Sequence, residues 1–111
     1  MKKFMVLYMA PVAALTQTMS ATPAQMKASM AEWQKWGDKN KKSIVDMGAP
    51  LGASLRVTTD GPSPSTNDLG GFSILQGESK EAIAATLKGH PHFMMPGGFI
   101  EVVELMAMPG T

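Results

Sequence analysis

Residues 2 to 9 read Lys-Lys-Phe-Met-Val-Leu-Tyr-Met, and this stretch decides the fold. After the two lysines every side chain is apolar or aromatic, at both alternations of an extended chain. That pattern is typical of a central strand that is covered on both faces of its sheet. The strand therefore needs two different covers.

The first cover is a helix that begins at Thr22, after Pro11 ends the strand and a loop intervenes. Thr22-Pro-Ala-Gln25 supplies an N-cap, a proline at the first helical position and a glutamine at N3. Apolar residues then recur at helical spacing, which predicts one buried stripe. Its members are Met26, Met30, Trp33, Gly37 and Ile44. Gly37 is expected to pack closely against the sheet.

The helix is predicted to reach Asp46, because Gly48 resembles a C-terminal cap and Pro50 follows it. Residues 51 to 58 alternate Leu, Ala, Leu and Val with Gly, Ser, Arg and Thr, which predicts a half-buried second strand. In that strand Arg56 faces away from the helices.

The remaining elements follow from turn and cap residues. Residues 60 to 68 are rich in turn formers and lead into a third strand at residues 71 to 76. Ser79 caps a second helix that runs to Leu87, and Gly89 closes it. Residues 99 to 106 form the fourth strand. The predicted order is β-α-β-β-α-β.

This order predicts a ferredoxin-like α+β fold, in which two helices cover one face of a four-stranded antiparallel sheet. The strand at residues 2 to 9 then leaves an apolar patch on the other face, and such patches mark interfaces. We therefore expect a homodimer that is formed through this face of the sheet.

Composition limits the function. The chain has 111 residues, the size of one domain, and no linker divides residues 1 to 111. Its formal net charge of +1 argues against nucleic acid as a partner. It has no cysteine, and no cofactor motif appears. Residues 4 to 15 imitate a signal peptide, but Pro11 interrupts them, so a cytoplasmic protein without a membrane span is expected.

Several short motifs occur in an order that resembles the YCII-related family, and in particular its DGPF-domain branch. These are the strand at residues 3 to 8, Pro23-Ala-Gln-Met, Asp46-Met-Gly, Asp60-Gly-Pro, Gly70-Gly-Phe, Glu78-Ser-Lys-Glu-Ala and Ile100-Glu-Val. The resemblance covers nearly the whole chain and implies a dimeric α+β barrel, with two ferredoxin-like units face to face. Ser63 stands where the branch has the phenylalanine of its name.

The resemblance also implies a histidine–aspartate pair, which has been taken to indicate enzymatic activity in some members. Asp46 matches the aspartate. Gln25 occupies the position of the histidine, and its amide cannot act as a general base because it does not titrate near neutral pH.

Two histidines, His90 and His92, are the remaining candidates for chemistry. In an extended segment their imidazoles share one side, next to apolar residues. Two nitrogens alone make a poor metal site, so no metal is expected. The candidate catalytic residues are His90, His92 and Asp46, and the candidate ligand-binding residues are Arg56, Trp36 and Gln25.

Two functions remain open at this point. The first is a small-molecule enzyme or binding protein whose apolar cleft lies near the dimer interface, with proton transfer or isomerisation of a small apolar organic molecule as its chemistry. The second is a non-catalytic dimeric module whose interface is its function.

Overall fold

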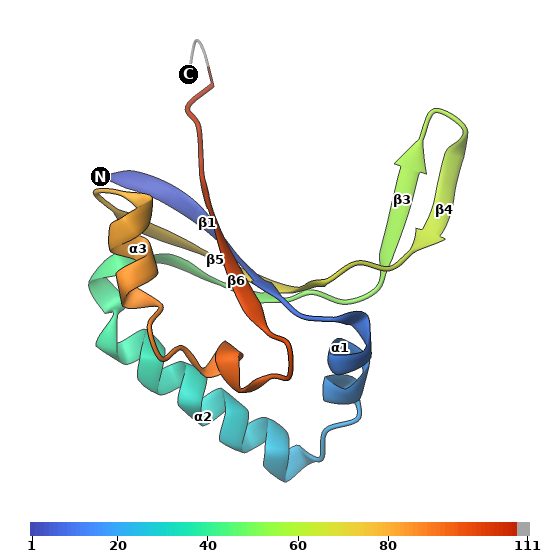
Figure 1. Cartoon of the computed structure of the whole chain (residues 1–111), viewed down its shortest axis with the longest axis horizontal. Helices are drawn as coiled ribbons and strands as arrows, with labels where there is room; N and C mark the ends of the chain where they lie inside the picture. The colour runs from blue at the N-terminus through green and yellow to red at the C-terminus, as the bar shows by residue number, and fades with distance from the viewer. Residues whose placement is uncertain (109–111) are drawn as a thin grey trace.

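The structure is a computed structural model, and it describes residues 1–108, except for the side chains of residues 17–19. Four antiparallel strands form one sheet in the order β2-β5-β1-β6 (Figure 1). This is the strand order of the ferredoxin-like fold, so the predicted fold class is confirmed. The strands are β1 (Lys2–Met9), β2 (Ile44–Pro50), β5 (Leu69–Gly77) and β6 (Phe99–Glu104).

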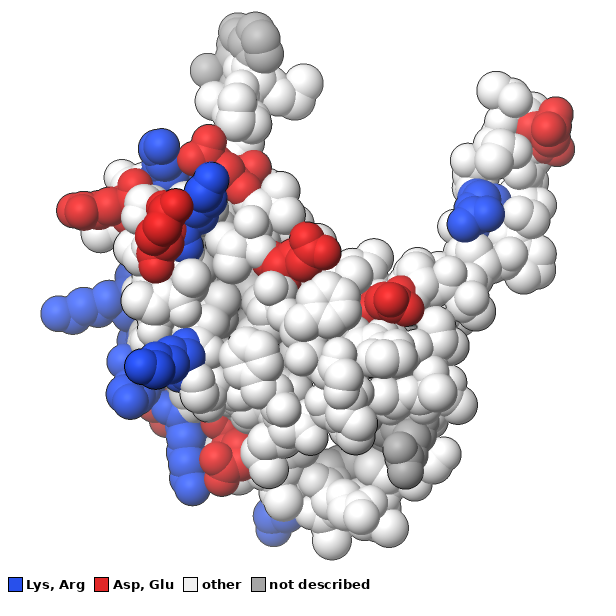
Figure 2. All heavy atoms as spheres, viewed as in Figure 1, with Lys and Arg blue, Asp and Glu red and all other residues white. Residues whose placement is uncertain are grey.

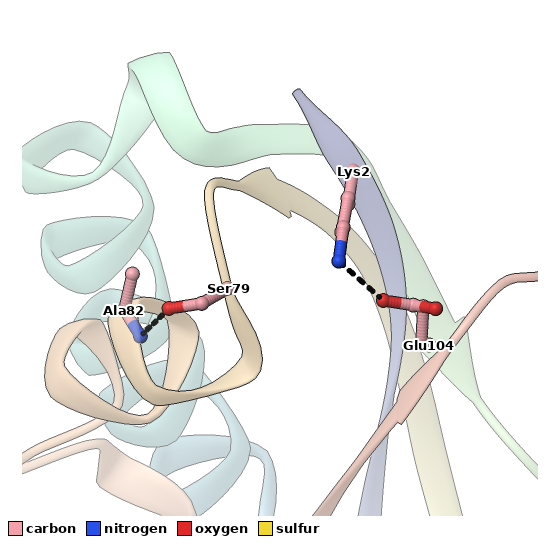
Figure 3. A network of polar contacts seen from close by, with 4 residues as sticks. All are labelled: Lys2, Ser79, Ala82 and Glu104. Carbon is pink, nitrogen blue, oxygen red and sulfur yellow. Dashed lines mark hydrogen bonds and ion pairs between the residues drawn. The ribbon is translucent and has the colours of Figure 1, made fainter.

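Two predicted helices cover one face of this sheet, α2 (Pro23–Lys39) and α3 (Lys80–Thr86) (Figure 1). Helix α2 begins as expected, because the Thr22 hydroxyl accepts the Gln25 backbone N–H and the Gln25 side chain accepts the Thr22 N–H. At the start of α3, the Ser79 hydroxyl accepts the backbone N–H of Ala82 (Figure 3).

The hydrophobic core lies between the sheet and these helices. It consists of alternate residues of β1 and β5 together with side chains of α2 and α3, namely Phe4, Val6, Tyr8, Trp36, Leu75, Ile83 and Leu87. At the outer end of the same face Lys2 of β1 forms an ion pair with Glu104 of β6, with 3.4 Å between the charged atoms (Figure 3). Both side chains are well exposed to solvent, so this pair adds little stability.

Helix α2 ends at Lys39 and not near Asp46 as predicted. The Asn40 side chain donates to the carbonyl of Trp36, and a 3-10 turn, η1 (Lys41–Ser43), follows. Ile44 then pairs with Leu75 of β5. The helix ends here because Ile44 and its neighbours pair with strand β5. This tertiary pairing outweighs the helical spacing of apolar residues that predicted a longer helix.

Gly48 is part of β2 and is not a helix cap. It lies at a shift in register between β2 and β5, with φ at +73°. A Cβ atom at this position would overlap the carbonyl oxygen of Phe72. The position therefore needs glycine for two reasons, the positive φ and the close approach of the neighbouring strand.

The predicted second strand at residues 51 to 58 is wrong in its placement. Strand β3 (Ser54–Thr58) pairs only with β4 (Gly61–Ser65), and together they form a separate two-stranded hairpin (Figure 1). Arg56 therefore lies on this hairpin and not on the main sheet. The alternating pattern does predict a strand, but it does not indicate which other strand pairs with it.

Two further predictions near the N-terminus need correction. The segment expected as a loop contains α1 (Val12–Met19), which begins where Ala14 and Leu15 donate to the Pro11 carbonyl. Met26 and Met30 are exposed rather than buried. The first half of α2 extends past the sheet, so the sheet covers the apolar stripe of this helix only from Trp33 onward. Gly37 does pack closely, with Met47 as its neighbour.

We call the face of the sheet away from α2 and α3 the open face. Its apolar side chains are half-buried or exposed: Met5, Leu7, Met9, Phe72, Ile74, Phe99 and Val103. No helix within residues 1–108 is long and apolar enough to cross a membrane.

Candidate functional site

The structure brings together three of the predicted site residues, Trp36, His90 and His92. They meet on the helix side of the sheet, where α2, the strand β1 and the 3-10 turn η2 (Pro91–Met94) come together. All three side chains are buried, and Tyr8, Trp33 and Ser73 complete the cluster.

The other three predicted site residues lie elsewhere. Gln25 is exposed and occupied in the capping box of α2. Asp46 is exposed on β2, opposite Ile74 of the open face, and its carboxylate accepts the N–H of Gly48 at 2.8 Å. Arg56 is on the hairpin. Within residues 1–108 no hydrogen bond or ion pair joins these three residues to a histidine.

His90 and His92 are placed by a tight turn, not by an extended segment as predicted. Gly89, with φ at +75°, redirects the chain after α3, and Pro91 starts η2. His90 caps this turn, since its Nδ1 accepts the backbone N–H of His92 at 2.9 Å. The cap directs the His90 ring into the core, where it is only 1% exposed.

Aromatic rings surround His90. Tyr8 stacks on the imidazole with 5.0 Å between ring centroids, while Trp33 and Trp36 meet it edge to face, each at 4.5 Å. The Trp36 indole N–H donates to the carbonyl of Thr86 at 3.0 Å, so this ring is anchored to α3.

The protonation state of His90 follows from these contacts. Because Nδ1 accepts a hydrogen bond, the neutral ring carries its proton on Nε2. Burial, and then the nearby charge of His92, lower the pKa of His90 to about 4. Within residues 1–108, Nε2 is the one buried side-chain nitrogen or oxygen without a hydrogen-bond partner. His90 is therefore a neutral donor at physiological pH, with only aromatic rings as weak acceptors around it.

Three other side chains of the cluster form hydrogen bonds: His92, Tyr8 and Ser73. The Nε2 atom of His92 lies 2.7 Å from the Met9 carbonyl, which can only accept, so His92 donates there. The Tyr8 hydroxyl donates to Ser73, and Ser73 donates to the carbonyl of Met47. Burial raises the pKa of Tyr8. The hydrogen bonds from Tyr8 through Ser73 to Met47 link β1, β5 and β2.

A hollow of about 450 Å³ lies on the outer side of Trp36, between α2 and α3. Pro91 and Gly89, the two neighbours of His90 in sequence, form part of its wall. The rest of the lining is mostly polar and cationic: Glu32, Lys35, Lys39, Asn40, Ala85, Thr86 and Lys88. Figure 2 shows charged side chains gathered on this side of the molecule. A second hollow, of about 580 Å³, lies between α3 and β6, and its mostly apolar lining includes Leu87, Phe93, Ile100 and Val102. The predicted apolar cleft near a dimer interface stays a prediction.

The charges of the hollow are unbalanced. Lys35 pairs with Glu32 at 3.3 Å. Lys39 and Lys88 have no ion-pair partner in the part of the chain that the structure describes. The hollow therefore presents two uncompensated cations beside the edge of an indole ring.

Sequence reasoning missed Tyr8, Ser73 and the two lysines. A tyrosine that alternates with Phe4 and Val6 needs a polar partner once it is buried, and Ser73 at an alternate position of the returning strand is a suitable one. Lys39 and Lys88 carried no such signal, because they are 49 positions apart and each reads as an ordinary helix-end cation.

The buried His90 predicts that stability depends on pH. In the unfolded chain its pKa returns to about 6.5, so between this value and about 4 the unfolded chain binds the proton more readily. The free energy of unfolding should therefore fall as the pH drops through this range, by up to about 3 kcal/mol. Denaturant titrations between pH 7 and pH 4 measure this fall. In H90F it should shrink, and an unchanged slope in H90F would contradict the assignment.

The comparisons with known proteins identify a shared fold but no family. No protein-family model and no curated protein matches the chain. The similar solved structures include 5-chloro-2-hydroxyhydroquinone dehydrochlorinase (TftG) from Burkholderia phenoliruptrix AC1100 in complex with 2,5-dihydroxybenzoquinone. The TM-score is 0.50 at 16% identity, over 89% of this chain and 90% of that one. The two proteins share a fold. At this identity the likeness shows the α+β architecture alone, and in TftG that architecture carries an enzyme that acts on a small molecule.

Proposed function

We propose that this chain forms a homodimer through its open face and binds a small organic anion in the hollow beside Trp36. The observation that carries the proposal is the hollow itself, with Lys39 and Lys88 unpaired on its wall. The dimer has separate support in the sheet.

The open face supports a dimer because its apolar side chains are continuous across three strands. Met5 and Leu7 lie at the centre, on β1. Ile74, Phe72 and Val103 are apolar cross-strand neighbours, and Glu101 of β6 lies opposite Leu7 on the same face. Directly opposite residues share a face of the sheet, so these side chains form one patch. A contiguous apolar patch of this kind marks an interaction site in soluble proteins.

The accessible surface supports the same conclusion. The chain exposes 8030 Å², whereas a compact monomer of its mass would expose about 5,900 Å². Its radius of gyration is 15.5 Å, against about 13 Å for a compact domain of this length. If each copy buried the excess, the dimer would bury about 4,000 Å² in total, which lies in the range of permanent dimers.

The ligand class follows from the lining of the hollow. Its volume lies within the range of small-molecule sites, about 300 to 1,000 Å³. Two ammonium groups without partners favour a negative charge, and the indole of Trp36 offers an apolar edge for a ring. A planar organic acid combines both properties. The ligand of TftG is a hydroxylated quinone, whose hydroxyl groups ionise readily, and it is a suitable first probe for this chain.

We propose binding and not proton transfer. The His90 Nδ1 is occupied by a backbone N–H, its low pKa keeps the ring neutral, and no carboxylate contacts either histidine within residues 1–108. A general base needs a free lone pair within reach of its substrate. Tyr8 is likewise occupied with Ser73.

The test is a calorimetric titration of the purified chain with 2,5-dihydroxybenzoquinone and with benzoate. The double variant K39Q/K88Q should weaken binding at least about tenfold, because it removes both charge-assisted contacts. The matched control K41Q/K80Q changes the net charge equally at exposed lysines outside the hollow, and it should bind as the wild type does. Equal losses in both variants would show a general charge effect, and no binding by the wild type would leave the dimer interface as the function.

A further inference from the structure

The hairpin of β3 and β4 is amphipathic. Directly opposite residues pair Leu55 with Pro64 and Val57 with Pro62, so these four side chains share one face. All four are exposed, and Leu55 and Val57 retain 66% and 75% of their accessible surface. The other face is polar and carries Ser54, Arg56, Thr58, Ser63 and Ser65.

The hairpin also has one blocked edge and one free edge. Pro62 and Pro64 have no N–H, so their pairs with Val57 and Leu55 are the non-hydrogen-bonded pairs of the ladder. The outward-facing positions of β4 are therefore prolines, which prevent another strand from adding there. On β3 the N–H groups of Leu55 and Val57 point outward.

No other strand within residues 1–108 pairs with this hairpin. Figure 1 shows it standing clear of the body and rising from the sheet on the side away from α2 and α3. An isolated two-stranded hairpin is marginally stable at best in water. Its exposed apolar face also contributes to the accessible surface by which this chain exceeds a compact monomer.

We propose that the hairpin is a dimer arm whose apolar face packs against the second copy. The inference rests on the proposed homodimer and adds a second contact to it, because a partner seated on the open face lies on the side toward which the hairpin rises. By two-fold symmetry each copy then clasps the other. A second copy fits better than an anionic membrane or nucleic acid, since the arm carries one cation, Arg56, and one anion, Asp60.

The test compares two variants of the arm by sedimentation equilibrium. L55S/V57S alters the apolar face and should raise the dimer dissociation constant at least about 100-fold, because two such side chains leave the interface in each copy. R56S alters the polar face of the same strand and should change it less than about threefold. Both sites are exposed in the single chain, so neither change threatens the core.

A second measurement does not depend on variants. The backbone amides of Arg56 and Ser63 pair within the hairpin, and their hydrogen exchange should be slow in the dimer and fast after dilution below its dissociation constant. If a charge on the open face dissociates the dimer while L55S/V57S does not, the proposed dimer interface is supported and the role of the hairpin as a dimer arm is refuted. A wild-type chain that is monomeric throughout refutes both. Loss of binding to neutral phosphatidylcholine vesicles in L55S/V57S, with an unchanged dimer, would assign the arm to a membrane surface.

Discussion

Replacing Gly48 with alanine should lower the free energy of unfolding by about 4 kcal/mol. The positive φ at Gly48 disfavours any side chain, and a Cβ atom would overlap the carbonyl oxygen of Phe72. Strand β2 would have to move away from β5, with loss of the bulge that carries Asp46. Denaturant unfolding followed by circular dichroism measures the change.

Gly52 provides the matched control. It lies four residues further along, and a Cβ atom there would meet nothing within 4 Å. Its φ is not positive, so G52A should change stability by less than about 1 kcal/mol. If G48A were as stable as G52A, the close contact between β2 and β5 would be wrong.

The second large effect is expected at Met5, at the centre of the open face. Its cross-strand neighbours are the apolar Ile74 and Val103, and the nearest cation on this face is Lys3, two residues earlier on β1. In the proposed dimer two such carboxylates would be buried among apolar side chains, and the dissociation constant should rise more than about 1,000-fold. Sedimentation equilibrium measures it, and circular dichroism shows whether the monomer remains folded.

The control for M5E places the same charge on the helix layer. Ala28 is exposed on α2, and A28E should leave the association unchanged. A dimer that survives M5E as well as it survives A28E would exclude the open face as its interface. The hollow beside Trp36 lies on the opposite side of the sheet, so M5E should still bind the ligand. This result would separate the proposed ligand binding from the proposed dimer.

The candidate site was only partly predictable. Trp36 and the two histidines were chosen for their chemistry, and the structure does bring them together. Asp46 and Gln25 came from a family resemblance, and the structure places both away from the histidines. Lys39 is the last residue of α2 and Lys88 lies in the turn after α3, and only the packing of α2 near α3 brings both to the same hollow. No local sequence pattern predicts that two residues so far apart in the chain lie close together in space.

The sequence by itself determined the fold class, the central strand at residues 2 to 9, the start of α2 at Thr22 and the cap of α3 at Ser79. These features are local, because periodicity and capping depend on residues within a few positions of each other. Only the tertiary structure decided where α2 ends, that Gly48 is a bulge, and that residues 54 to 65 form a free hairpin. Each of these depends on which strand pairs with which, and hydrogen-bonded pairing between distant segments leaves no signature in either segment alone.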